Sequence, residues 1–223
     1  MAQDFDPKQL NRQQIRLRAV LESGSDEGIP LFLRQHAMLH SARMAQAGLW
    51  SYEDVLLDGI EDKLFRRIPA KAEHSVAWAI FHITRIEDVA MNLLVAGGNQ
   101  VLDEGDWLQQ MKLDVHHTGN AMPQQDVATL SAAIDLQGLR DYRVAVGRRT
   151  QGITKQLSKE DLKHGVDPQR LAKVMEQEAL LPGAEGIADY WGGRTIAGLL
   201  LMPASRHILV HLNEAARLKA RRG

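Results

Sequence analysis

The chain of 223 residues contains nine histidines, and their spacing is its most informative chemical feature. His207 and His211 are four residues apart, as are His36 and His40, so on a helix each pair points to one side. His82 lies alone within a strongly apolar run. Because cysteine is absent, any transition metal must be held by histidine or carboxylate side chains. The histidines therefore predict a metal site.

The helical stripes that carry these histidines indicate that they face the core. One stripe continues from His207 and His211 through apolar residues: Leu200, Ala204, Ala215 and Leu218. A second continues from His82 through Trp78, Ile86, Val89 and Leu93. A buried polar group without a partner costs about 1–3 kcal/mol, and one divalent cation would satisfy three converging imidazoles. Three protein ligands with an open fourth position is the arrangement of a catalytic zinc site.

Spacing alone leaves two alternatives open. A histidine on an apolar face is often a core residue that hydrogen bonds satisfy without any metal. The pair His36 and His40 shares a stripe with other apolar residues, Ile29, Leu33 and Met44, and competes with His207 and His211 as the ligand pair. The remaining histidines lie near predicted helix ends or loops, where we expect them to be solvated: His74, His116, His117 and His164.

The elements that must position these residues are helices, because apolar residues recur with helical periodicity and strand alternation is absent. Asp6 followed by Pro7 is typical of a helix start. The expected helices are 7–22, 28–48, a short one from 51, 72–96, 124–135, 136–157, 168–180 and 195–217. Residues 99–123, a candidate lid, and the glycine-rich 181–193 are expected to be irregular. Pro203 predicts a bend before His207. The pattern predicts one all-α domain, an antiparallel bundle with additional short helices.

Composition and missing motifs exclude several functional classes. Basic and acidic residues number 27 and 28, which argues against a broad surface for nucleic acid or anionic lipid. The first residues lack a signal-peptide pattern, and the longest apolar runs, 76–83 and 196–202, are too short to span a bilayer. We therefore expect a cytoplasmic protein with neither nucleic-acid nor membrane partners. No Walker-type loop, dinucleotide fingerprint or serine nucleophile elbow is present.

Two segments resemble the DinB-like (DinB/YfiT) superfamily of metal-binding four-helix-bundle proteins. The run PAKAEHSVAWAIFH at 69–82 resembles the family's second helix, where Ser-Val and an apolar stretch lead to a histidine. The run GRTIAGLLLMPASRHILVH at 193–211 is similar to the family's last conserved helix, where a His-x-x-x-His pair completes the metal site. The resemblance covers residues 27–223, whereas the helical extension at 1–26 and the insertion at 158–193 exceed a minimal member.

The resemblance implies an antiparallel four-helix bundle, often a homodimer, that binds zinc, nickel or iron through His82, His207 and His211. Family members with known activity include S-transferases that use a low-molecular-weight thiol, isomerases that use such a thiol, and non-haem iron sulfoxide synthases. We therefore expect a metal-dependent enzyme for a small-molecule substrate, first a thiol S-transferase and otherwise a hydrolase, with water activated by the metal. The alternatives are a non-catalytic, stress-associated metal- or ligand-binding protein and a purely structural helical module.

Three acidic residues lie close in sequence to the expected ligands. Glu214, three residues after His211, is spaced to orient a ligand imidazole and is the one candidate for a catalytic side chain. Glu87 and Asp88 follow His82 by five and six residues. For all three we favour a solvated or ion-paired face with a nearby arginine, Arg85, Arg206 or Arg217.

Two further pairs are candidates for substrate binding. Tyr190 and Trp191 precede the last helix and are expected either at the pocket mouth or as ordinary packing aromatics. His36 and His40 are expected to contact substrate, because the first long helix of the resembled family also borders its site.

Overall fold

The computed structural model describes residues 7–45 and 50–221, and these residues are helical or irregular. Within those two ranges there is no β-strand, and an isolated bridge joins Gly165 to Thr195. The predicted all-α fold class is confirmed. The helix start at Asp6 and residues 46–48 of the predicted second helix lie outside the described residues. None of the described helices combines the length and the apolar character that crossing a bilayer requires.

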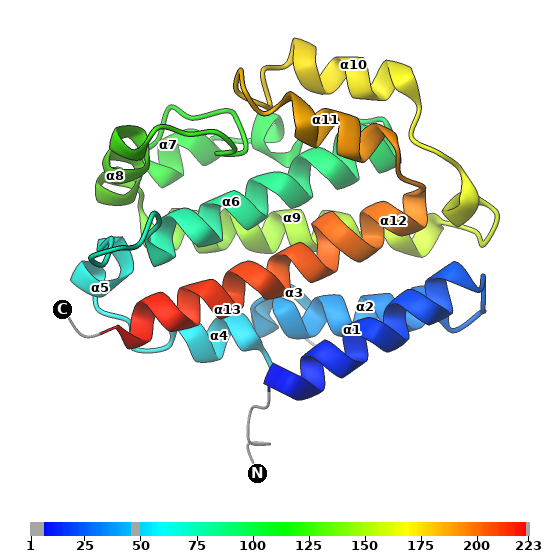
Figure 1. Ribbon diagram of the computed structural model, residues 1–223, viewed down its shortest axis with the longest axis horizontal. Coiled ribbons are helices and arrows are strands. Elements are labelled where there is room, and N and C mark those ends of the chain that lie inside the picture. Colours follow the sequence, from blue (N-terminus) through cyan, green and yellow to red (C-terminus); the bar gives the residue numbers. More distant parts are fainter. Residues whose placement is uncertain (1–6, 46–49, 222–223) are drawn as a thin grey trace.

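The five longest described helices, labelled in Figure 1, are α1 (Pro7–Glu22), α2 (Gly28–Leu39), α6 (Val76–Asp88), α9 (Leu136–Gln156) and α13 (His207–Ala220). Shorter helices connect them: α3 (Ala42–Ala45), α4 (Tyr52–Leu57), α5 (Asp62–Arg66), α7 (Trp107–Met111), α8 (Gln124–Ala133), α10 (Pro168–Glu176), α11 (Glu185–Gly192) and α12 (Ile196–Leu201). Two π-helical segments, η1 (Val89–Ala96) and η4 (Met202–Arg206), extend α6 and join α12 to α13. Two 3-10 turns, η2 (Val101–Glu104) and η3 (Asp161–Lys163), complete the described elements.

The helix α6 with its extension η1 forms the centre of the fold. Ser75 begins it by accepting a hydrogen bond from the backbone N–H of Trp78 at 2.9 Å, and Gly97, with φ of 68°, ends it. Every residue from Val76 to Val95 is buried. A helix that is apolar and buried on all sides leaves no solvated face for the charged residues within it, so these must find partners in the interior.

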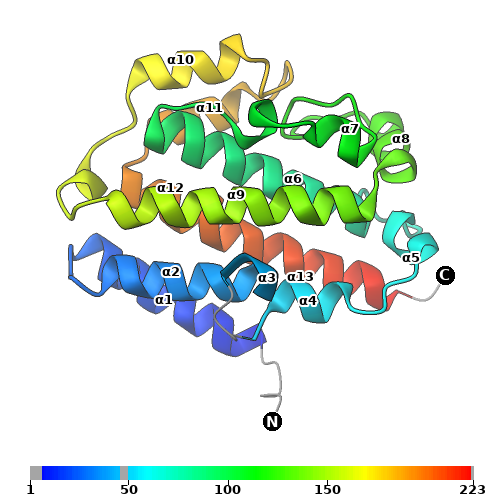
Figure 2. The ribbon, with the colours of Figure 1, turned by 180° about the vertical axis from the view of Figure 1, so that it is seen from behind.

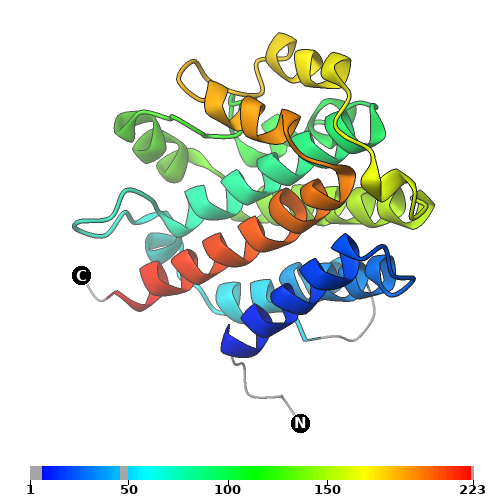
Figure 3. The same ribbon diagram turned by 45° about the vertical axis from the view of Figure 1, so that its right-hand side comes forward.

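The other long helices surround α6. Helices α9 and α13 both pack against it, and the opposite views of Figures 1 and 2 show the α12–α13 segment in front in the first and α9 in front in the second. Helix α2 packs against α9 and η4, and α1 packs against α2 and α12, as Figure 3 also shows. Helices α10 and α11 pack against each other beside η1. The site elements α6 and α13 thus lie in contact along the core.

Several predicted boundaries are wrong, for physical reasons. The second helix ends at Leu39, because His40 takes an extended backbone (φ −108°, ψ 164°) and its carbonyl accepts a hydrogen bond from Ser51 Oγ at 2.7 Å. The segments 99–123 and 181–193, expected to be irregular, contain η2, α7 and α11. Their helices bury residues such as Met111 and Trp191, so tertiary packing outweighs the glycines around them.

Two glycines of α9 provide a test of how closely the helices pack. A Cβ at Gly138 would lie 2.2 Å from the backbone oxygen of Gln110, whereas a Cβ at Gly152 would meet nothing within 4 Å. We expect Gly138→Ala to lower the free energy of unfolding by about 2 kcal/mol through overpacking. Gly152→Ala, the matched control, is expected to raise it by about 0.5–1 kcal/mol. Urea unfolding followed by circular dichroism measures both, and equal effects would contradict the close approach of α7.

Candidate metal centre

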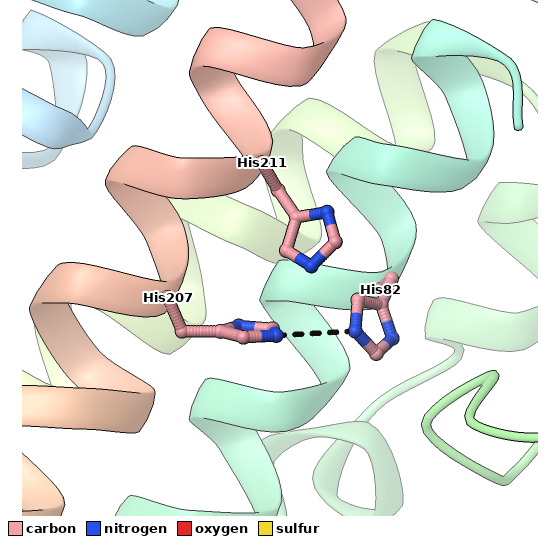
Figure 4. Close-up of side chains that lie close together, drawn as sticks. All are labelled: His82, His207 and His211. Carbon is pink, nitrogen blue, oxygen red and sulfur yellow. Dashed lines mark hydrogen bonds between the residues drawn. The ribbon is translucent and has the colours of Figure 1, made fainter.

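Three histidines from two helices converge in the core. His82 comes from α6, and His207 and His211 come from successive turns of α13 (Figure 4). One ring nitrogen of each lies within 4.8 Å of the others, and the Nε2 atoms of His82 and His207 are 3.2 Å apart. The structure thus brings together the three residues that the sequence pattern singles out, which we call the histidine triad.

The elements that hold the triad are set by local sequence. Pro203, where the sequence predicts a bend, lies in the π-helical segment η4, whose wider turn ends where α13 begins with His207. The four-residue interval then places His211 one turn further along the same face. Opposite them, the apolar residues of α6 bury His82, which is 2% exposed, against α13. The two contacting helices therefore fix the three rings.

Hydrogen bonds on the outer side of two rings determine where their protons lie. Nδ1 of His82 is 2.6 Å from the carbonyl oxygen of Thr118, and Nδ1 of His211 is 2.7 Å from a carboxylate oxygen of Glu214. Because both oxygens can only accept, each Nδ1 donates, which leaves Nε2 as the nitrogen through which each ring can bind a metal. Such outer partners are typical of metal-ligating histidines, because they orient the ring and raise its basicity.

Burial keeps the imidazoles of His82 and His207 uncharged. It lowers the pKa of His82 to about 3, with a further contribution from the neighbouring His211, and it also holds the pKa of His207 well below the usual range. Burial acts to raise the pKa of Glu214, but the hydrogen bonds from His211 and His74 outweigh it and hold that pKa well below its usual value. At neutral pH His82 and His207 are therefore neutral and Glu214 is ionised, which are protonation states that metal binding requires.

The residues present fit a divalent transition metal. Without a cation, a single N–H from Nε2 of His207 would face the lone pairs of both other rings, and Nδ1 of His207 is buried without a partner. Nitrogens held about 2.0–2.1 Å from a tetrahedral zinc ion lie roughly 3.3 Å apart. The 3.2 Å between His82 and His207 agrees with that separation. The triad could therefore hold a divalent cation.

A stack of aromatic rings supports the triad from one side. The ring of His74 lies 3.7 Å from that of Trp78, which lies 4.6 Å from that of His82, with interplanar angles of 3° and 12°. Nδ1 of His74 also contacts Glu214 at 2.9 Å. The expectation that His74 is solvated is therefore wrong. The four-residue spacing of His74, Trp78 and His82 could have predicted this stack. It was missed because His74 precedes the first turn of α6.

Glu214, Glu87 and Asp88 were expected to be solvated or paired with arginine, and the first two are not. Glu214 binds two histidines, and Glu87 is fully buried between His36 and His40. Asp88 does pair with Arg85, at 3.0 Å, but both side chains are fully buried. For Glu87 and Asp88 the missed signal is that α6 is buried on every face, which leaves these two acids no exposed surface.

A cavity of about 230 Å³ adjoins the triad at His207. It is lined by α6, by the segment before α8 and by the residues that precede α13: Ile86, Asn120, Ile187, Tyr190, Trp191, Met202, Pro203 and His207. Tyr190 and Trp191, the predicted mouth residues, both line it. The segment 99–123 supplies Asn120 and the carbonyl of Thr118, so the predicted lid packs against the site. His36 and His40 do not line this cavity and are fully buried, so we do not assign them to substrate.

Comparison with known proteins adds no assignment to this geometry, because no family model and no curated protein matches the chain.

Proposed function

We propose that the chain is a metal-dependent, DinB-like enzyme with a four-helix-bundle core that transfers a low-molecular-weight thiol to an electrophilic small molecule. The observation that carries the proposal is a triad of converging imidazoles with outer partners on two rings and a cavity beside the third. Zinc, nickel or iron held by His82, His207 and His211 would act as a Lewis acid that lowers the pKa of a thiol.

The cavity beside His207 favours an apolar group on the electrophile. Its walls are mainly aliphatic and aromatic, and the two exceptions are His207 and Asn120. The Asn120 carbonyl oxygen accepts a hydrogen bond from the hydroxyl of Thr118 at 2.8 Å, so the amide NH₂ is the group that it offers to a substrate oxygen. A mostly apolar site with one polar anchor orients its ligand and excludes water.

A groove of about 450 Å³ next to this cavity favours an acidic thiol. The groove shares Tyr190 and Met202 with the cavity and is also lined by arginines, Arg18, Arg194 and Arg206. Arg18 is paired with Glu22, and Arg194 lies over the ring of Tyr190 at 4.0 Å. Arg206 takes part in no ion pair among the described residues, and it immediately precedes His207. Its guanidinium is therefore suited to bind a carboxylate of the thiol substrate.

The proposal is tested with glutathione as the thiol and monochlorobimane as the electrophile. In this reaction the thiol sulfur forms a C–S bond as chloride leaves, the thiol proton passes to the buffer, and fluorescence rises. We expect turnover in protein loaded with zinc or nickel, and only the background rate after metal removal or in His207→Ala. We expect Arg206→Ala to raise KM for glutathione about tenfold, roughly the loss of one charge-assisted pair, with little change in kcat.

The matched control is Arg16→Ala, because Arg16 is on α1 but does not line the groove. Its kinetic constants are expected to equal those of the parent protein. A protein that binds one metal ion at the triad yet turns over neither glutathione nor cysteine would contradict the transferase and favour the non-catalytic binding protein. The homodimer that belongs to the proposed family type is checked separately, by light scattering on the same preparations.

A further inference from the structure

A second group of side chains that could hold a metal ion lies in the core, formed by His36 of α2, His40 directly after that helix, and Glu87 of α6. All three are fully buried, and one ligand atom of each lies within 4.8 Å of the others. Nε2 of His36 is 2.7 Å from Oε1 of Glu87, and Nε2 of His40 is 3.0 Å from Oε2. Both imidazoles thus face one carboxylate. We call these residues the buried His–Glu cluster.

Hydrogen bonds satisfy this cluster incompletely. A carboxylate can only accept, so the 2.7 Å contact has His36 donating from Nε2 to Glu87. Nε2 of His40 and Oε2 of Glu87 lie close but lack hydrogen-bond geometry, and both atoms are buried without a partner. Each such atom costs about 1–3 kcal/mol. A cation bound by these two facing atoms would partner both.

The charges in the cluster are also unbalanced. Burial acts to raise the pKa of Glu87, but His40 and His36 outweigh it and hold that pKa well below its usual range. Burial, and then the charge of Arg143, lowers the pKa of His40 to about 3. Arg143 itself is bonded to Glu53 at 2.6 Å, and no lysine or arginine within the described ranges pairs with Glu87. Buried charges in proteins are paired or coordinate a metal.

We propose that His36, His40 and Glu87 form a second divalent-cation site, separate from the histidine triad. Two imidazoles and one carboxylate suit zinc, iron(II), manganese or cobalt. Glu87 follows His82 by five residues, about 140° around α6, so the two sites face different sides of that helix. The ion would tie α2 to α6 in the closed core, which makes it a structural ion whose binding is coupled to folding.

The packing around the cluster is compatible with an ion. Ligands about 2.0–2.2 Å from zinc lie roughly 3.0–3.5 Å apart, so the two contacts of 2.7 and 3.0 Å need to widen by only a few tenths of an ångström. Helix α9 leaves room for the His40 ring through a glycine, because a Cβ at Gly147 would lie 2.8 Å from Nδ1 of His40. The ring of His36 stacks on Phe32, with centroids 5.4 Å apart. The rings are therefore held in place before an ion binds.

Zinc binding by the full-length protein tests the proposal. Protein stripped with a chelator and reloaded with Zn²⁺ is titrated against a chromophoric chelator, and crystals are examined by anomalous diffraction at the zinc edge. We expect two zinc equivalents in the parent protein, one in Glu87→Gln, one in His82→Ala and none in the double variant. Because glutamine matches glutamate in size, Glu87→Gln removes the charge while conserving packing. Circular dichroism is used to check that the variant folds.

The anomalous map of the parent protein tests the second site without relying on any variant. A peak within coordinating distance of Nε2 of His36 and His40 is expected in addition to the peak at the triad. No peak there, or two equivalents retained in Glu87→Gln, would overturn the second site. Zinc retained by His82→Ala at this cluster would support the second site even if the triad bound no metal, so the two proposals fail separately.

Discussion

Replacing His82 by alanine is expected to remove the zinc equivalent that we assign to the histidine triad. The ring of His82 is one of three nitrogen ligands, and its Nδ1 is already held by the Thr118 carbonyl, so Nε2 is oriented before metal arrives. Loss of an outer partner typically reduces metal affinity 10–100-fold, and loss of a ligand is expected to reduce it by more than about a hundredfold. Competition with a chromophoric chelator measures the affinity.

Two further variants serve as reference points for the loss of zinc affinity in His82→Ala. Glu214→Ala removes the partner of Nδ1 of His211 but leaves every ligand in place, so we expect an intermediate loss of about 10–100-fold. His164→Ala removes an exposed imidazole that is not part of the histidine triad, and we expect it to leave the zinc affinity unchanged. If His82→Ala bound as much zinc as the parent protein, the triad would be a hydrogen-bonded group in the core. That result would also contradict the transferase proposal.

Local periodicity was sufficient to predict that each histidine of the triad faces the core, because each of them lies on a regular helix. His207 and His211 share one face of α13, and His82 lies in the apolar run that becomes α6. Their convergence depends on the contact between α6 and α13, more than a hundred residues apart in sequence, which periodicity does not encode. The resemblance to a known family supplied that pairing at the sequence level.

The parts that sequence reasoning missed depend on long-range partners. The second helix was expected to continue past residue 40, but Glu53 accepts the backbone N–H of Ser41 at 3.1 Å and Ser51 bonds the carbonyl of His40. These contacts satisfy the chain outside a helix. Likewise, the partners of Glu87 come from α2 and from His40, which directly follows it, so identifying Glu87 as a buried acid requires knowing that this segment packs near α6. Solvation is the correct default for an acid only where a helix has an exposed face.

The largest expected change in stability comes from the same absence of an exposed face on α6. Asp88 accepts hydrogen bonds from the Arg85 guanidinium at 3.0 Å, the Tyr142 hydroxyl at 2.5 Å, and the backbone N–H groups of Val101 and Leu102 at 2.8 and 3.0 Å. Asp88→Ala would leave the fully buried charge of Arg85 without its carboxylate and would free two buried backbone donors. Breaking a buried ion pair costs about 3–5 kcal/mol.

We therefore expect Asp88→Ala to lower the free energy of unfolding by about 3–5 kcal/mol, which is a large part of the stability of an ordinary domain. Urea unfolding followed by circular dichroism measures it. The control is Asp141→Ala, whose carboxylate pairs with Arg43 at 2.6 Å on the surface, where such a pair contributes at most about 1 kcal/mol. Equal midpoints for the two variants would mean that water reaches Arg85, contrary to its complete burial. A large difference would show that α6 depends on its internal ion pair, since no solvent is available to replace it.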